Sequence, residues 1–126
     1  MNRENTNLLY IKYNDLYKGH TKSAQESCMC FGFACKDGWF NLIDELSQEI
    51  VTYCRNNHID VPEVVQVKEK FGTLRFYLDI YNDEIEDIIE KYEQLSKETC
   101  EVCGKPGKIR SGGWLICLCD TCNNDR

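Results

Sequence analysis

The clearest pattern along the chain is a helical repeat between residues 38 and 57. Apolar side chains recur there every three or four residues, as is typical of a helix with one buried face. Asp37 precedes the repeat and can accept hydrogen bonds from the first free backbone N–H groups, so we expect it to cap this helix. The side chains expected to be buried are Trp39, Leu42, Ile43, Leu46, Ile50, Tyr53 and Cys54.

Apolar and polar residues alternate after Pro62, and this change of period predicts a β-hairpin. Residues Glu69 to Gly72 are expected to form the turn, because Gly72 can adopt the positive φ that tight turns require. One face of the hairpin has to be covered by a helix, since an isolated hairpin is marginally stable. The residues expected on that face are Val65, Val67, Leu74, Phe76, Leu78 and Ile80.

A second helix is predicted from Asp83 to about Lys97, where the first four residues, DEIE, match a capping box. Its expected buried stripe consists of Ile85, Ile88, Ile89, Tyr92 and Leu95. Its opposite face is acidic and carries Glu84, Glu86, Asp87, Glu90 and Glu93.

The first 36 residues are less regular. Apolar residues between Leu8 and Tyr17 fit either a short helix or an extended arm, and Gly19 ends this segment. Polar residues from His20 to Ser27 indicate a loop. Together, the elements predict an α+β fold in which two helices pack on a small antiparallel hairpin.

The cysteines add a second unit to this picture. Cys100 and Cys103 are separated by two residues, as are Cys119 and Cys122, and a spacer of fifteen residues joins the two pairs. This spacing lets two tight turns direct four sulfur atoms at one zinc ion. We therefore predict a zinc ribbon at residues 99–126, following an α+β core with an N-terminal arm at residues 1–98.

The predicted zinc ion is structural. Four thiolates close its coordination shell, whereas a catalytic zinc keeps one position open for water or substrate. Cys117 is a rival ligand, but the pair Cys119 and Cys122 repeats the spacing of the first pair. We expect Cys117 to pack as a small apolar residue instead.

Three further cysteines, Cys28, Cys30 and Cys35, allow two interpretations. With a histidine they could form a second metal site, although their spacing is not that of a standard zinc knuckle. Alternatively, they are buried thiols without a ligand. A cysteine nucleophile with His20 or His58 as its base is less favoured, because neither histidine belongs to a local catalytic signature. We expect no enzymatic activity.

The formal net charge of the chain is −6, which favours a basic protein partner over nucleic acid. Cations nevertheless gather in two places, at the hairpin turn and in the ribbon. The residues are Lys68, Lys70 and Arg75 in the first place, and Lys105, Lys108 and Arg110, with Trp114, in the second. The ribbon group leaves open an alternative function as a nucleic-acid-binding or regulatory module.

No stretch of the sequence is long and apolar enough to span a membrane, and the first residues do not resemble a secretory signal. Nine cysteines in a reducing compartment also agree with metal binding better than with disulfides. We expect the protein in the cytoplasm of a bacterial cell, without a membrane partner.

Three blocks of sequence carry a family resemblance. They are CMCFGFACKDGWFNLI at residues 28–43, VQVKEKFGTLRFY at residues 65–77, and TCEVCGKPG at residues 99–107 together with Gly113–Trp114 and LCDTC at residues 118–122. In these blocks the chain resembles a family of small phage and prophage proteins with a zinc ribbon. It is also similar to anti-CRISPR proteins that inhibit the type II RNA-guided nuclease.

The resemblance implies a phage accessory protein rather than an enzyme, with Cys100, Cys103, Cys119 and Cys122 as the zinc ligands. It implies a host protein as the partner, namely the type II CRISPR nuclease or its guide-RNA complex. It does not assign a binding surface. The residues themselves suggest one, because Glu84, Asp87 and Glu90 would form an acidic strip on the second helix.

Overall fold

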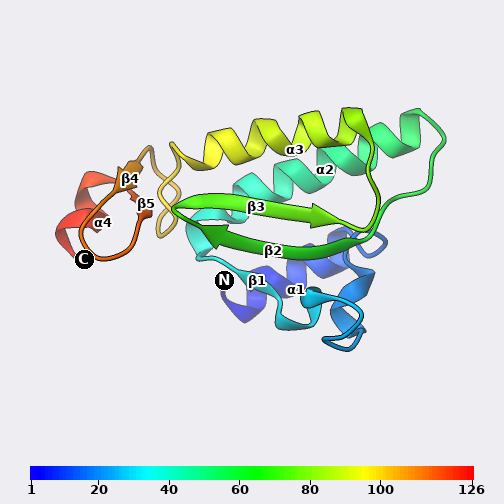
Figure 1. Ribbon diagram of the computed structural model, residues 1–126, viewed down its shortest axis with the longest axis horizontal. Coiled ribbons are helices and arrows are strands. Elements are labelled where there is room, and N and C mark those ends of the chain that lie inside the picture. The colour runs from blue at the N-terminus through cyan, green and yellow to red at the C-terminus, as the bar shows by residue number, and fades with distance from the viewer.

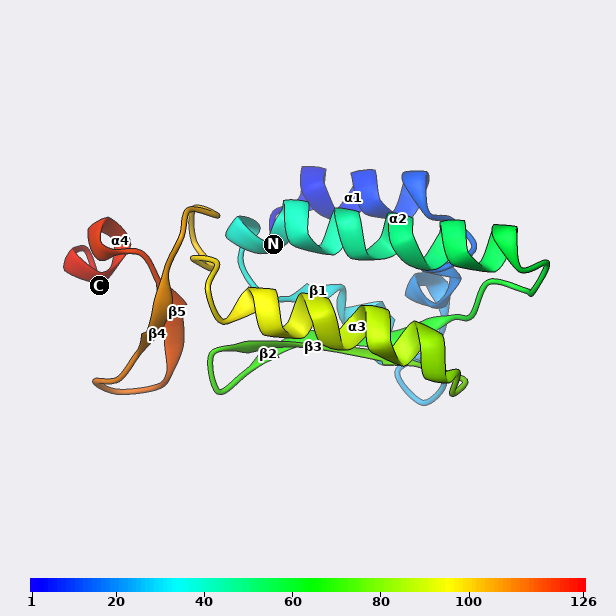
Figure 2. The ribbon, with the colours of Figure 1, turned by 90° about the horizontal axis from the view of Figure 1, so that it is seen from above.

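A computed structural model describes all of residues 1–126 as an α+β protein with a small ribbon at one end. Helices α1 (Arg3–Lys12) and α2 (Phe40–Asn56) lie over one face of a three-stranded sheet, and α3 (Asp83–Ser96) runs along one of its edges (Figures 1 and 2). No helix lies over the other face of the sheet. None of the helices is long and apolar enough to cross a lipid bilayer.

The sheet consists of β1 (Phe33–Ala34), β2 (Val64–Lys70) and β3 (Thr73–Leu78), in that order. The strands β2 and β3 form the predicted antiparallel hairpin, and β1 pairs with β2 in parallel. The sequence did not predict β1, because two residues are too few to show an alternating pattern. The predicted α+β class is confirmed.

The C-terminal ribbon consists of β4 (Lys108–Arg110), β5 (Ile116–Leu118) and the short helix α4 (Asp120–Asn124). It packs against the tip of the β2–β3 hairpin, where Gly72 faces Ile109 and Ile116. A division of the chain at residue 98 stays a prediction, since the ribbon and the core share contacts across that point.

The long central helix α2 buries the predicted face against the sheet. Trp39, Ile43, Leu46 and Ile50 are fully buried, and the Trp39 indole N–H donates to the carbonyl oxygen of Thr99 at 2.9 Å. The predicted cap was wrong. The Asp37 carboxylate accepts hydrogen bonds from the backbone N–H of Asn2 and the amide of Asn5, so it fastens the start of α1 instead of α2.

The hairpin follows the prediction except at its ends. Val64 is buried in place of Val65, because the register shifts at a bulge between Val64 and Gln66. Ile80, expected on the apolar face, is exposed, because β3 ends at Leu78. The turn itself is the residue pair Phe71 and Gly72, both with positive φ (54° and 83°), as in a type I′ turn.

Helix α3 is present with a different cap and a shorter buried stripe. Its first free N–H groups, those of Glu84 and Ile85, donate to the side chain of Asn82, so Asn82 rather than Asp83 caps the helix. Leu95, expected to be buried, is exposed, and Ser96 is fully buried beside it. The stripe ends early because the last turn of α3 faces polar backbone of β3.

That last turn closes the outer edge of the sheet. The backbone N–H of Leu74 donates to the Ser96 hydroxyl at 2.9 Å, and the N–H of Phe76 donates to the Glu93 carboxylate at 3.2 Å. Glu93 was predicted on the acidic outer face, but this hydrogen bond places its carboxylate at the β3 edge, where burial raises its pKa. An edge strand with free donors can pair with other chains, and α3 prevents this by supplying side-chain acceptors.

The N-terminal segment forms a helix rather than an extended arm. Leu9, Leu16 and Tyr17 are fully buried beneath the sheet, and the Tyr17 hydroxyl lies 2.6 Å from the hydroxyl of Ser47 in α2. The backbone N–H of Val64 donates to the carbonyl of Leu16 at 2.8 Å, which ties this segment to the start of β2. Residues 1–17 are therefore part of the core.

We expect Trp39→Ala to lower the free energy of unfolding by ~3–5 kcal/mol, because it removes a fully buried ring together with its hydrogen bond to Thr99. Trp114→Ala is the matched control, since Trp114 is exposed and should change stability by less than ~0.5 kcal/mol. Urea unfolding followed by circular dichroism measures both. Equal stabilities for the two variants would contradict the packing described here.

Ser96→Ala should lower stability by ~1–3 kcal/mol, because the buried N–H of Leu74 would lose its acceptor. Ser23→Ala, in an exposed loop, serves as the control. Hydrogen exchange of the Leu74 amide gives a local measurement. It should become faster in Ser96→Ala, and unchanged protection of this amide would show that Ser96 does not close the edge.

Candidate metal centre

The first pair of candidate ligands lies in a tight loop between the core and the ribbon. The backbone N–H of Gly104 donates to the carbonyl of Cys100 at 2.9 Å, and the N–H of Cys100 donates to the carbonyl of Lys105 at 2.8 Å. Gly104 has a φ of 82°, a conformation that residues with a side chain rarely adopt. This loop places the sulfur atoms of Cys100 and Cys103 on one side.

The second pair is presented by the start of α4. Cys119 precedes the helix, and its sulfur accepts a hydrogen bond from the backbone N–H of Cys122 at 3.4 Å. The sulfur atoms of Cys103 and Cys119 lie 3.6 Å apart, which brings the two pairs together. The short strands β4 and β5 provide the return path between them.

The four sulfur atoms of Cys100, Cys103, Cys119 and Cys122 all lie within 4.8 Å of one another. In a tetrahedral zinc site with Zn–S bonds of ~2.3 Å, neighbouring sulfur atoms are ~3.8 Å apart. The arrangement therefore fits a single metal ion bound by four cysteines. The residues are those that the sequence spacing predicted.

The electrostatics of the cluster favour a cation. Burial acts to raise the pKa of Cys100, but the backbone N–H groups of Cys119, Cys103 and Val102 outweigh it and lower this pKa to about 6. The hydrogen bond with Cys119 and burial raise the pKa of Cys122 to about 12. The thiolate form of Cys100 is thus favoured, whereas ionisation of Cys122 beside the other sulfur atoms is opposed. A divalent cation would allow all four cysteines to ionise.

The other cysteines lie outside this cluster. Cys117 is fully buried, and its thiol donates to the carbonyl of Lys97 at 3.2 Å, while burial raises its pKa to about 11. Cys28, Cys30 and Cys35 are not gathered around a common point, and no second group of converging ligands was found. Cys35 is buried, and burial raises its pKa to about 12.

Neither histidine belongs to the four-cysteine cluster. The His20 ring stacks on the ring of Tyr10, with centroids 4.1 Å apart, and His58 is exposed just beyond the end of α2.

Sequence reasoning missed the residues that attach the ribbon to the core, namely Gly38 and Glu101. The carbonyl of Glu101 accepts from the N–H of Gly38 at 2.7 Å, and its carboxylate accepts from the N–H of Lys36 at 3.0 Å. A Cβ atom at residue 38 would lie 2.2 Å from the carbonyl oxygen of Cys100, so only glycine fits there. The position of Glu101 between two candidate ligands is the only sequence signal for this role.

The acidic residues of α3 and the cations of the ribbon, both considered as binding residues, differ in whether they are paired within the protein. Glu84, Asp87 and Glu90 are exposed on α3, and none of them belongs to any of the four ion pairs. Arg110, in contrast, donates to the carbonyl of Leu118 and pairs with Asp120 at 2.7 Å. Because Arg110 is already bound to groups of the ribbon, it is less available to a phosphate, and this weakens the alternative of a nucleic-acid-binding ribbon.

No protein-family model, curated protein or solved structure matches this chain. The fold and the site by themselves define the class of protein. It is a small α+β protein whose C-terminal ribbon carries four cysteines close enough together to hold one metal ion.

We expect one metal ion per chain, lost in Cys103→Ser because three thiolates bind a tetrahedral metal less well than four. Cys117→Ser is the matched control, as this cysteine lies in the ribbon outside the cluster and should keep the metal. Elemental analysis of the purified protein measures both variants. A metal content near zero in the wild type, or an unchanged content in Cys103→Ser, would contradict the site. A content near two would point to Cys28, Cys30 and Cys35.

Proposed function

We propose that the protein is a non-enzymatic, zinc-binding accessory protein of phage origin that binds and inhibits a host protein. The target we propose is the type II CRISPR nuclease or its guide-RNA complex. The observation that carries this proposal is the unpaired acidic face of α3, in a molecule whose metal site has no room for substrate.

The metal site supports a structural role for zinc. All four of its ligands are cysteines, and thiolates closing a tetrahedral shell leave no position for water or substrate. Zinc rather than a harder cation suits this donor set, because soft sulfur ligands in a tetrahedron are typical of zinc. In this function the metal stabilises the ribbon and takes no part in chemistry.

The acidic face of α3 supports a basic partner. The helix sequence DEIEDIIEKYEQLS contains six acidic residues and one lysine, and that lysine, Lys91, pairs with Glu49 of α2. The exposed carboxylates of Glu84, Asp87 and Glu90 form no ion pair within the protein and are available to a partner. A groove that binds nucleic acid is lined with cations, so a strip of carboxylates is complementary to it.

The sequence resemblance supports the choice of target. Its three blocks include the cysteine pairs and the strands of the hairpin, and anti-CRISPR proteins are the members to which the chain is similar. Other basic host proteins would satisfy the charge argument equally, so the experiment has to include the nuclease itself.

We expect cleavage of target DNA by a type II nuclease with its guide RNA to fall when this protein is added in molar excess. Changing Glu84, Asp87 and Glu90 together to lysine should abolish the inhibition, because the strip would then repel a basic groove. The matched control changes Asp15, Asp60 and Asp125 to lysine, which alters the net charge equally at exposed positions away from α3.

Inhibition should also weaken as salt rises, because exposed charges are screened beyond ~8–10 Å at physiological ionic strength. Full cleavage with nucleases from several hosts would count against the proposed target. Inhibition that survives the α3 charge reversal but not the control reversal would place the binding surface elsewhere on the protein.

A further inference from the structure

The open face of the sheet carries an arrangement of charge unlike the rest of the protein. The register of β2 and β3 pairs Gln66 with Tyr77, Lys68 with Arg75, and Lys70 with Thr73, on the side away from the buried pair of Val67 and Phe76. Neighbouring strand residues alternate between faces, so these six residues share the uncovered face, where Thr73 is buried at the turn and Arg75 is half-buried. They include three cations and no carboxylate, in a chain with a net charge of −6.

Nothing within the protein neutralises these cations. None of the four ion pairs involves Lys68, Lys70 or Arg75. The Glu93 carboxylate is close enough to Arg75 to sense its charge, but it accepts the hydrogen bond of Phe76 and forms no ion pair. Lys68 and Arg75 lie directly opposite each other, and like charges in such a cross-strand pair destabilise a sheet. The cations of this face are therefore available to bind an anionic ligand.

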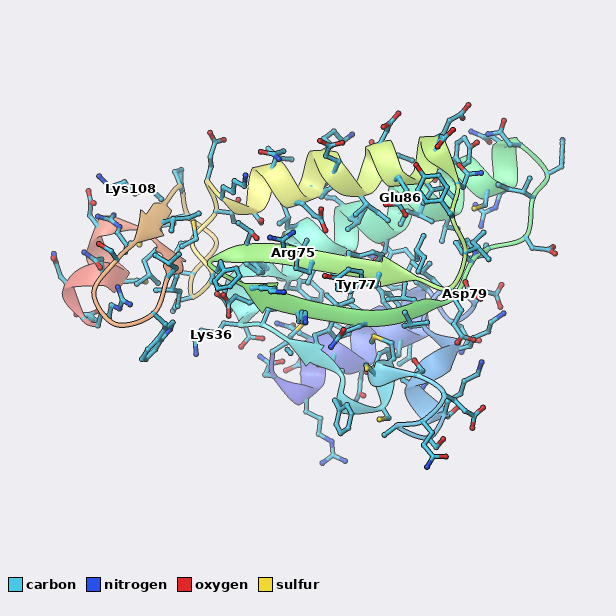
Figure 3. The ribbon with its side chains drawn as sticks, in the orientation of Figure 1. Lys36, Arg75, Tyr77, Asp79, Glu86 and Lys108 are labelled. Atoms are coloured by element: carbon cyan, nitrogen blue, oxygen red, sulfur yellow. The ribbon has the colours of Figure 1, made fainter.

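Aromatic rings accompany the cations. Tyr77 is 42% exposed, and the ammonium group of Lys68 lies 5.9 Å from the centre of its ring. In Figure 3 the side chains of Arg75 and Tyr77 lie over the uncovered side of the sheet, and Glu86 lies on α3 beside the β3 edge. The acidic surface of α3 thus borders the basic face of the sheet at the β3 edge.

The turn of the hairpin adds a second exposed ring. Phe71 is 65% exposed and has a φ of 54°, a conformation that is unfavourable for a bulky residue and that Asn or Gly would adopt more easily. Its side chain is not needed for the core, and the ammonium group of Lys70 lies 5.6 Å from its ring centre. Strained residues of this kind cluster at functional sites.

We infer that this face, formed by Lys68, Lys70, Arg75 and Tyr77 with Phe71 at its tip, binds single-stranded nucleic acid. Cations on a flat sheet contact backbone phosphates, and exposed aromatic rings stack on bases that are not paired. A duplex hides its bases, and an acidic protein would use the cations but not the rings. The inference goes beyond the proposed inhibition, which uses α3, and it places nucleic-acid binding on the sheet rather than on the ribbon.

The test is fluorescence anisotropy of a labelled 12-nucleotide RNA, and of the DNA of the same sequence, with the full-length metal-loaded protein. We expect dissociation constants of roughly 1–100 µM at 50 mM salt. The logarithm of the binding constant should fall with the logarithm of salt with a slope of about −2, as for three phosphate contacts. No binding of either strand at this salt concentration would overturn the inference.

Two variants separate charge from stacking. Lys68→Gln with Arg75→Gln should weaken binding at least tenfold and reduce the slope to about −0.7, the value for one contact. Tyr77→Leu should weaken binding about tenfold without changing the slope, because it removes a stacking platform and no charge. A Tyr77→Leu variant that binds like the wild type would overturn the assignment to nucleic acid. Circular dichroism and metal content confirm that each variant is folded.

The matched control is Lys105→Gln with Lys108→Gln, which removes two exposed cations from the ribbon. We expect it to bind like the wild type, and loss of binding in this control alone would move the site to the ribbon. The duplex form of the oligonucleotide should bind more weakly than either strand. Equal binding of the duplex, or equally effective displacement by a poly-glutamate peptide, would also overturn the inference.

Discussion

The loop from Cys100 to Cys103 connects the metal site to the core, because the same few residues serve both. Cys100 and Cys103 present two of the four ligand atoms, and Glu101 between them accepts hydrogen bonds from the backbone of Lys36 and Gly38. The N–H of Glu101 in turn donates to the carbonyl of Cys117 in β5. A metal ion that holds this loop therefore also fixes the junction between β1 and α2.

The ribbon also contacts the core at this junction and at the hairpin turn. Trp39, the largest fully buried side chain, donates its indole N–H to Thr99, the residue before the first ligand. At the other end of the ribbon, a Cβ atom added to Gly72 of the hairpin turn would lie 3.3 Å from the side chain of Ile109 and 3.5 Å from the backbone of Ile116, so the turn and the ribbon are in close contact. The hydrophobic core and the metal site thus share a boundary, so loosening one affects the other.

The arrangement of charge follows from how the sheet is covered. Helices α1 and α2 occupy one face, and α3 occupies the β3 edge, where Ser96 and Glu93 accept the free backbone N–H groups. Once α3 is bound to that edge, Glu84, Asp87 and Glu90 remain exposed to solvent. The uncovered face of the sheet keeps the cations of β2 and β3, and the carboxylates of α3 border it at the β3 edge, where Glu93 senses the charge of Arg75.

Much of the fold could be predicted from local pattern. The spacing of apolar residues predicted α2 and its buried face, the alternation after Pro62 predicted the β2–β3 hairpin, and the two cysteine pairs predicted the four converging sulfur atoms. These features could be predicted because each is encoded over a few consecutive residues, as a helical period, a strand period or a tight turn between two ligands.

Only the tertiary structure decided which of the candidate capping residues and polar side chains bind which backbone groups. Asp37 looks like a helix cap in sequence but binds the start of α1, and Asn82 rather than Asp83 caps α3. The parallel strand β1, the hydrogen bond between Glu93 and Phe76, and the Gly38–Glu101 contact join segments far apart along the chain, and no local period marks them. Hydrogen-bond partners of this kind depend on which backbone groups the folded chain leaves unsatisfied, and that becomes known only when the elements are packed together.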